Sequence, residues 1–414
     1  MLFLFIFAVL SAVLSAVLSA VLTMAPPAAD LALPKEAPSR GSVSLPISKR
    51  VAHFHKPNST ILDFEMFQGH LMHIHAKYSR NMANFRTNTR TEHPFHKTSN
   101  TTLEGRATGK VGLTDFNDYV WIGTIAFGQP AQSILVDFDT GSADTLVNAG
   151  AYRPSASSTS VRTSRTFHTS YGDGTSATGT VYRDTVHIGG LSAPSAAIGL
   201  AIQQFLNPTT EGGDQGISGL SFQSISTFGL PGFFDSLRSA GVLSSPVFSF
   251  RLAETGSTLT LGGYDPAEIS GGITWIPVDP LKGFWVVPGE FNGFGHVTSI
   301  MDTGTTAIIV PFMDALVVFK SLGMSALLYG GALYGTFNCS RPPPLTFIYG
   351  GKSVTLTGTS QTLGTDKDGA CISVIVGQDG HLGGAWIVGD AFLRNVISIF
   401  DKGNNRFGIA NLAR

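Results

Sequence analysis

The chain has 414 residues, of which 43% are hydrophobic and only 13% are charged, with 48 glycines and 29 phenylalanines. This length exceeds one ordinary domain, and the many glycine and aromatic residues favour a mainly β body with tight turns over a helical bundle. The formal net charge of −1 gives no support for a nucleic-acid partner, and we expect none.

The first 29 residues are mostly apolar. Met1–Ala25 contains no charged residue and repeats Ser-Ala-Val-Leu from Ser11, Ser15 and Ser19. A run that starts at residue 1 and is followed by small residues is typical of a cleaved signal peptide. We therefore predict a signal peptide over residues 1–29 and a secreted protein, extracellular or vacuolar. The run lacks a positive n-region and is long enough to span a membrane, so a membrane anchor is the alternative.

Residues 30–109, here called the N-terminal segment, are rich in proline, histidine and basic residues. Between residues 31 and 110 there are 12 Lys and Arg against 5 Asp and Glu, a net charge of +7, and from residue 111 onward the net charge is −7. A basic segment before an acidic body indicates an intramolecular partner, although many such stretches are merely solvated. Histidine charging should tighten this attraction unless some rings are buried neutral and are expelled when protonated. The segment holds seven of the 11 histidines: His53, His55, His70, His73, His75, His93 and His96.

The body begins near residue 110, where strand-like runs alternate with glycine pairs that are typical of turns. Two short helices are predicted at Phe233–Ala240 and Pro311–Leu322, the second with proline in its first turn. Strands are predicted at Tyr119–Phe127, Ser133–Asp139, Val181–Ile188, Thr258–Leu261, Val354–Leu356 and Val396–Phe400.

One motif occurs twice in the body. Asp139-Thr-Gly-Ser recurs as Asp302-Thr-Gly-Thr, and each copy is followed later by an apolar pair ending in glycine. The interval from aspartate to glycine is 80 residues to Gly219 and 87 residues to Gly389. A repeated order at nearly equal intervals predicts two related lobes, which we assign to residues 110–285 and 286–414.

The two aspartates suggest a specific chemistry. A two-fold axis between the lobes would place Asp139 and Asp302 side by side, and two adjacent carboxyl groups do not both ionise easily. One can then accept a proton from a bound water while the other, protonated, polarises a carbonyl group. This arrangement predicts amide hydrolysis without a covalent intermediate, a metal or a cofactor.

The residues that follow each aspartate fit supporting roles. The glycines allow tight turns and present N–H groups to the carboxylates, the threonines can hydrogen-bond across the axis, and the last hydroxyl of each motif can donate to the outer carboxylate oxygens. These supporting residues are Thr140, Gly141, Ser142, Thr303, Gly304 and Thr305.

With these motifs the chain resembles the pepsin-like aspartic endopeptidases, of a secreted, fungal type, from about Tyr119 to Ala410. The resemblance implies an all-β, bilobal pepsin-like fold after a signal peptide and propeptide, an acidic pH optimum, a monomer, and polypeptide substrates bound in extended conformation. It is carried by Ile122–Pro130, Val136–Asp144, Ile300–Thr306, Trp386–Arg394 and Phe400-Asp401.

The same resemblance implies that the N-terminal segment is a propeptide that inhibits its own body. Members of this family hold a basic side chain of the propeptide near the aspartates. Here the candidates are Lys77, Arg80, Lys97 and Lys110.

The resemblance also assigns a substrate-binding flap and a disulfide. Tyr171, Gly172 and Asp173 match the hairpin flap that closes over the substrate. An even number of cysteines in an exported chain indicates a disulfide, and the pair Cys339 and Cys371 matches that of the family's C-terminal lobe. The chain departs from the family at Leu146, where a tryptophan is usual, at Gln215, which intervenes where many members have Asp-Gly directly, and in lacking a disulfide in the first lobe.

Three other functions are weaker alternatives. A catalytically idle peptide-binding protein on the same fold generally loses an aspartate or the flap, and this chain keeps both. A glycosidase also uses two carboxylates but does not need duplicated Asp-Thr-Gly turns. Metal-dependent hydrolysis has little support because the body has only four histidines, His168, His187, His296 and His381, and no His-Glu-x-x-His motif.

Overall fold

The computed structural model describes residues 41–50, 54–95, 120–170, 176–203, 215–253, 256–379 and 382–413. All of them belong to one unit, Arg40–Arg414. The predicted signal peptide lies outside these residues. No helix within the described ranges is long and apolar enough to cross a membrane.

The first half of the body forms an eight-stranded sheet, counted over the described residues. Alternating apolar residues give its strands one buried face, as in β4, where Ile134, Val136 and Phe138 are fully buried. In spatial order the strands are β2 (Ser48–Arg50), β3 (Val120–Phe127), β4 (Gln132–Asp139), β9 (Gly216–Gly219), β5 (Thr145–Val147), β8 (Leu191–Ala201), β7 (Ser176–Ile188) and β6 (Val161–Ser170).

The second half forms a ten-stranded sheet within the described part of the chain. The first of its strands along the chain, β13, begins one residue after the predicted lobe boundary at residue 285. In spatial order the strands are β16 (Ser325–Tyr329), β17 (Ala332–Phe337), β21 (Cys371–Gly377), β15 (Ile308–Val310), β22 (Trp386–Val388), β14 (Gly295–Met301), β13 (Val286–Phe291), β18 (Thr346–Tyr349) and β19 (Lys352–Thr355), with β20 (Thr362–Thr365) paired to β21.

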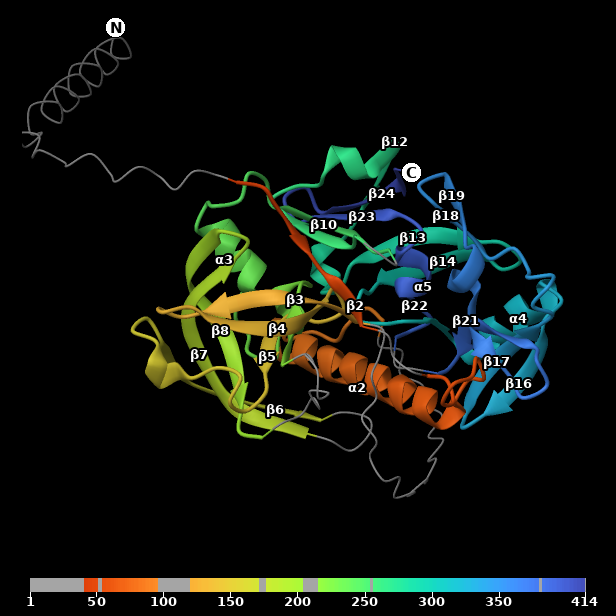
Figure 1. The fold of residues 1–414 in the computed structure, drawn as a ribbon, viewed down its shortest axis with the longest axis horizontal. Coiled ribbons are helices and arrows are strands. Elements are labelled where there is room, and N and C mark those ends of the chain that lie inside the picture. The colour runs from red at the N-terminus through yellow and green to blue at the C-terminus, as the bar shows by residue number, and fades with distance from the viewer. Residues whose placement is uncertain are drawn as a thin grey trace, which may run out of the picture. The chain divides into compact units, whose positions relative to one another are not determined.

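A third, six-stranded sheet combines strands from all parts of the described chain (Figure 1). The strand β1 comes from the N-terminal segment and lies at its edge, antiparallel to β11. In order the strands are β1 (Val43–Pro46), β11 (Thr258–Leu261), β10 (Val247–Arg251), β23 (Ile397–Asp401), β24 (Arg406–Leu412) and β12 (Ile269–Pro277).

The two repeated motifs occupy equivalent places in the two larger sheets. Strand β4 is parallel to β9, which brings Asp139 opposite Gly219, and β5 is antiparallel to β9. In the second half β14 is parallel to β22, and β15 is antiparallel to β22. The mainly β fold with two related halves, expected from the repeat, is confirmed.

The predicted short elements of the body are also confirmed. All six predicted strands overlap observed ones, namely β3, β4, β7, β11, β19 and β23. The two predicted helices correspond to α3 (Phe233–Ser239) and α4 (Phe312–Ser321), and a further helix, α5 (Asp390–Leu393), follows β22. Five 3₁₀ turns complete the described elements: η1 (Pro154–Ala156), η2 (Gln223–Ile225), η3 (Pro266–Glu268), η4 (Pro280–Lys282) and η5 (Gly358–Gln361).

The N-terminal segment contains a long helix that was not predicted from the sequence. Helix α2 (Phe64–Thr89) has 26 residues, and Asp63 caps it by accepting hydrogen bonds from the N–H groups of Glu65 and Met66. Its apolar stripe is interrupted by polar residues that are buried as well, His70, Lys77 and Asn81, and these obscure the helical period. The buried apolar stripe consists of Phe67, Leu71, Ile74, Tyr78, Met82 and Phe85.

The helix α2 runs between the two halves of the body (Figure 1). Near its start, the Gln68 side-chain amide donates to the Gly330 carbonyl of the second half at 2.6 Å. Farther along, Arg80 donates to Thr169 Oγ1 of the first half at 2.6 Å. The segment therefore contacts both halves.

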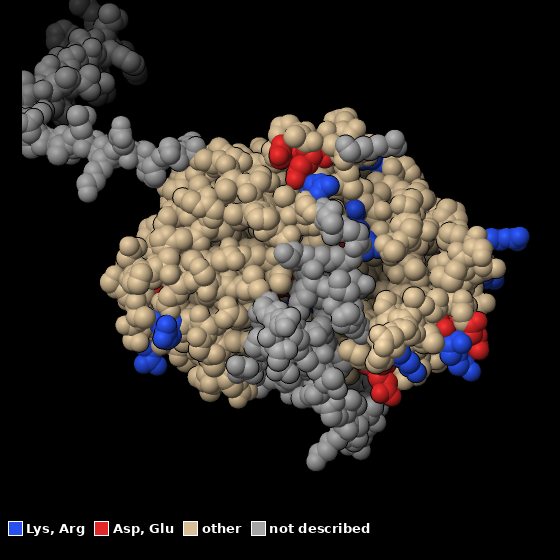
Figure 2. All heavy atoms as spheres, viewed as in Figure 1, with Lys and Arg blue, Asp and Glu red and all other residues tan. Residues whose placement is uncertain are grey.

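The disulfide predicted between Cys339 and Cys371 is present. It joins the loop after β17 to the start of β21. On the face shown in Figure 2, charged side chains are scattered in small groups, in keeping with a charged content of 13%.

Candidate active site

Two aspartates lie at the ends of equivalent strands. Asp139 is the last residue of β4, and Asp302 directly follows β14. Both are buried, at 3% and 0% relative exposure. A Cβ atom on Gly141 would lie 2.5 Å from Asp302 Oδ1, and one on Gly304 would lie 2.3 Å from Asp139 Oδ1. Each turn therefore needs glycine because the opposite carboxyl group packs against it.

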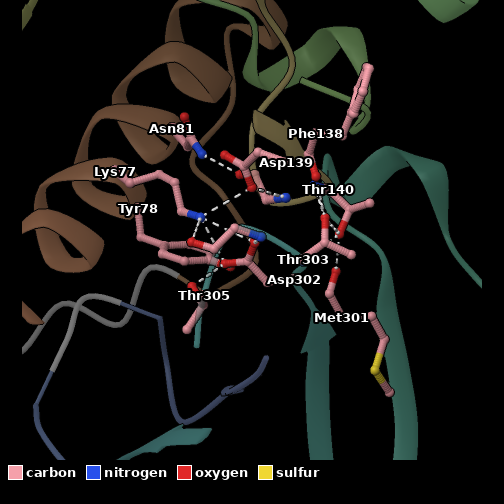
Figure 3. A network of polar contacts seen from close by, with 12 residues as sticks. Lys77, Tyr78, Asn81, Phe138, Asp139, Thr140, Met301, Asp302, Thr303 and Thr305 are labelled. Carbon is pink, nitrogen blue, oxygen red and sulfur yellow. Dashed lines mark hydrogen bonds and ion pairs between the residues drawn. The ribbon is translucent and has the colours of Figure 1, made fainter. Parts of the chain in front are cut away.

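The two turns are joined by a symmetric set of hydrogen bonds (Figure 3). The N–H of Thr140 donates to Thr303 Oγ1, and the N–H of Thr303 donates to Thr140 Oγ1, both at 3.0 Å. Each hydroxyl then donates onward: Thr140 to the Met301 carbonyl at 2.9 Å, and Thr303 to the Phe138 carbonyl at 2.6 Å. This arrangement holds the two strand ends, and so the two aspartates, in register.

Each carboxyl group also accepts hydrogen bonds from its own turn. The N–H of Gly141 donates to Asp139 Oδ1 at 2.8 Å, and that of Gly304 donates to Asp302 Oδ1 at 3.0 Å. The hydroxyl of Thr305 donates to Asp302 Oδ2 at 2.6 Å.

The last hydroxyl of the first motif differs from its counterpart in the second. Ser142 Oγ is buried without a hydrogen-bond partner of normal geometry among the described residues, although the hydroxyl lies near enough to Asp139 to lower its pKa. The hydrogen bond expected from this hydroxyl to the carboxylate is thus formed by Thr305 and not by Ser142.

A lysine of helix α2 lies between the two aspartates (Figure 3). Lys77 Nζ is 3.2 Å from Asp139 Oδ1 and 2.8 Å from Asp302 Oδ2, and it also donates to the Gly304 carbonyl at 3.2 Å. The next residue, Tyr78, donates its hydroxyl to Asp302 Oδ2 at 2.8 Å. Of the four basic candidates, Lys77 is thus the one that reaches the aspartates; Arg80 does not, and Lys97 and Lys110 lie outside the described residues.

The electrostatics of this cluster separate the two acids. Burial lowers the pKa of Lys77, but the charges of Asp139 and Asp302 outweigh burial and hold that pKa above its ordinary value. Burial raises the pKa of Asp139, against the opposing charge of Lys77 and with the added charge of Asp302. Burial acts on Asp302 too, but the Lys77 charge and the hydrogen bonds lower its pKa to about 2. With Lys77 bound, the Asp302 carboxylate therefore stays ionised well into acid.

Other residues near the dyad were missed at the level of sequence. Asn81, one helical turn after Lys77, donates to the Gly141 carbonyl at 2.8 Å. Asp137 and Asp390 are buried close to the dyad, and burial raises the pKa of each well above its ordinary value. Trp121 lies near both aspartates: its backbone is close to the Asp137 carboxyl group, and its indole is close to the Asp390 carboxyl group. Both residues belong to motifs that were recognised in the sequence. They were missed because only their burial, which the sequence does not give, distinguishes them from surface aspartates.

The predicted flap residues Tyr171, Gly172 and Asp173 lie outside the described residues. The strands on either side of them, β6 and β7, are paired antiparallel up to Ser170 opposite Ser176. Over the ranges that are described, no group of three or more His, Cys, Asp or Glu is arranged to hold a metal ion.

Comparison with known proteins agrees with this geometry. The family model described as eukaryotic aspartyl protease matches residues 120–412. The chain is 38% identical to "Secreted aspartyl protease 1" of Malassezia globosa, covering 92% of this chain and 96% of that protein. It is 34% identical to "Rhizopuspepsin-2" of Rhizopus niveus (93% and 97% covered) and 31% identical to "Pepsin A" of Gallus gallus (73% and 86% covered).

Proposed function

The chain belongs to the eukaryotic aspartyl protease family, and from this membership and the paired aspartates we propose that it is a secreted aspartic endopeptidase made as a zymogen. Its aspartic peptidase activity follows from the relatives, which are aspartic proteases and pepsins over most of the chain. Secretion is supported by the name of the Malassezia relative. The proposal adds the catalytic roles, the inhibited form and its release.

The single observation that carries the zymogen proposal is Lys77. Its ammonium group contacts both carboxyl groups at 3.2 and 2.8 Å, which is the position that a water shared by the two aspartates would need. With Tyr78 also bonded to Asp302, helix α2 excludes both this water and an extended polypeptide from the dyad. The described form is therefore a latent one, in which the N-terminal segment inhibits its own body.

After the segment leaves, the dyad can hydrolyse a peptide bond. The two carboxyl groups hold one proton between them, because both do not ionise easily at this spacing. The ionised aspartate accepts a proton from the water, whose oxygen adds to the peptide carbonyl carbon, and the other aspartate donates its proton to the carbonyl oxygen. The tetrahedral intermediate then gives a proton to the amide nitrogen, the C–N bond breaks, and the products are a carboxylic acid and an amine.

The test is acid activation of the purified full chain. We expect protein that is held at acidic pH to lose its N-terminal segment, to digest a denatured protein substrate, and to be blocked by a peptide that mimics the tetrahedral intermediate. Activity at neutral pH that is unaffected by such a peptide would contradict the mechanism. N-terminal sequencing of the secreted product before and after acid treatment would decide between a cleaved signal peptide and an anchor and would locate the processing site.

A further inference from the structure

A histidine just after helix α2 bonds the N-terminal segment to the connection between the two halves. His93 lies four residues after helix α2 and is 2% exposed. Its Nε2 is 2.7 Å from the Lys282 carbonyl oxygen in η4, and its Nδ1 is 3.1 Å from the N–H of Phe95. One ring nitrogen thus binds the body and the other binds the segment.

These two partners determine the protonation state of the ring. A carbonyl oxygen only accepts, so Nε2 of His93 must carry a proton; a backbone N–H only donates, so Nδ1 must be bare. The bonded form is therefore the neutral imidazole with its proton on Nε2. Protonation of Nδ1 would turn this acceptor into a donor facing the Phe95 N–H, and the bond would be lost.

The surroundings oppose a charged ring as well. The ring is packed against the aromatic rings of Phe85, Phe95 and Phe284, with centroids 4.6, 5.0 and 5.6 Å away. Burial lowers the pKa of His93. The hydrogen bond to the Lys282 carbonyl opposes this in part, and the nearby cation of Lys282 adds a smaller lowering of the pKa.

The other charged groups on the elements around His93 are engaged elsewhere or are cationic. On the segment, the Glu92 carboxylate pairs with Arg86 at 3.3 Å on the exposed surface, and Arg90, which caps α2, is a cation. On η4, the Asp279 side chain accepts the Leu281 N–H at 3.0 Å. Among the described residues of these elements, no carboxylate is therefore bonded to the ring and able to stabilise its charged form.

The same aromatic cluster extends to the dyad. The ring of Phe284 contacts His93 on one side and Tyr78, at 5.3 Å, on the other, and Tyr78 is bonded to Asp302. Meanwhile the ion pair of Lys77 with Asp302 persists to a pH near the Asp302 pKa of about 2. Protonation of Asp302 alone therefore does not explain release of the segment in mild acid.

We propose that His93 is an acid sensor: its protonation releases the residues that follow helix α2 from η4 and thereby starts activation. The inference rests on the proposed zymogen function and adds a trigger to it. In the released segment the ring titrates near its ordinary pKa of about 6.5, whereas in the latent form it takes up a proton only at lower pH. Below pH 6.5 the ratio of released to latent protein should thus rise by up to about tenfold for each pH unit, until the lowered pKa is reached.

The experiment compares the full-length parent with His93→Gln and His55→Gln. Glutamine cannot charge, yet its amide can donate to the Lys282 carbonyl and accept from the Phe95 N–H. His55 is the matched control, because this half-buried histidine of the same segment also bonds a body carbonyl, that of Leu363, at 2.9 Å. After a short exposure to each pH from 7.5 to 3.5, we would measure the cleaved fraction and, by pulsed hydrogen exchange corrected for pH, the protection of the α2 amides.

We expect α2 to lose protection in the parent before cleavage, and at a midpoint that His93→Gln lowers by at least half a pH unit while His55→Gln leaves it unchanged. A variant such as His93→Asn, which also cannot charge, should shift it the same way. Equal midpoints for the parent and both His93 variants, or an equal shift in His55→Gln, would overturn the inference. Release of α2 without any cleavage or peptidase activity in the parent would instead overturn the proposed function and leave the sensor in place.

Discussion

Replacing Lys77 with methionine is the most direct test of the latent form. The substitution keeps most of the apolar stem but removes the ammonium group of a buried side chain, which contacts both aspartates and the Gly304 carbonyl. Removing one partner of a buried ion pair costs about 3–5 kcal/mol, because a buried charge is left without compensation. At 1.36 kcal/mol per factor of ten, this is roughly a 10²- to 10⁴-fold shift from latent towards released protein.

The pH dependence has a definite sign. The Asp302 pKa is lowered in the latent form, so the contribution of its pairing to latency is complete above the ordinary aspartate pKa and is lost as pH falls towards about 2. Asp139, whose pKa is raised, can take up a proton once the cation is gone and so recover part of the cost in acid. The effect of Lys77→Met should therefore be greatest at neutral pH.

The assay is the appearance of peptidase activity and of cleaved segment at pH 7, with Lys56→Met as the control. Lys56 is exposed and belongs to the same segment, so its substitution makes the same change in net charge away from the dyad. We expect the parent and the control to remain intact and inactive at pH 7 and Lys77→Met to process itself within the same time. A properly folded Lys77→Met protein as latent as the parent would refute the role given to this lysine.

Three further predictions follow from the same contacts. Asp139→Asn or Asp302→Asn should lower the rate of self-processing at acidic pH at least about 10²-fold, since each removes one half of the proton exchange, and processing near the parent's rate would refute the dyad. Leu146→Trp should lower the free energy of unfolding in urea by about 1–3 kcal/mol, because Leu146 is 5% exposed in a packed cluster; unchanged stability would mean that the site has room. Changing both Cys339 and Cys371 to alanine should cost about 3–4 kcal/mol for a cross-link 32 residues apart, while kcat/KM at 25 °C stays within twofold.

The body could be predicted from the sequence because its signals are local. Strands alternate apolar residues, turns carry glycine, and the duplicated Asp-Thr-Gly motif lies at the end of equivalent strands in both halves. The reason for glycine in these turns was only partly predicted. Gly141 and Gly304 are needed because the opposite aspartate lies within 2.5 Å of where their Cβ would be, a contact between residues more than 160 positions apart in the chain.

The helix that blocks the dyad could not be predicted in the same way. Its buried face includes Lys77 and Asn81, which are polar because they meet the two aspartates and the Gly141 carbonyl rather than an apolar core. Hydrophobic periodicity therefore does not reveal a helix whose buried face packs against a polar surface. Charge counting had a related limit: a net charge of +7 does not single out Lys77, whose ammonium group makes the described ion pairs to Asp139 and Asp302.

The geometry of the latent form bears on what activation has to change. The Thr140–Thr303 hydrogen bonds across the axis and the bonds from Gly141 and Gly304 to the carboxylates are all in place while Lys77 is bound. The dyad is thus already assembled, and in the proposed zymogen the N-terminal segment would inhibit by occupying the dyad and not by distorting it. Activation then requires only that helix α2 leave, and the catalytic geometry needs no later rearrangement of the two strand ends. The trigger proposed at His93 fits this arrangement, because it would weaken the attachment of the segment and leave the hydrogen bonds of the dyad untouched.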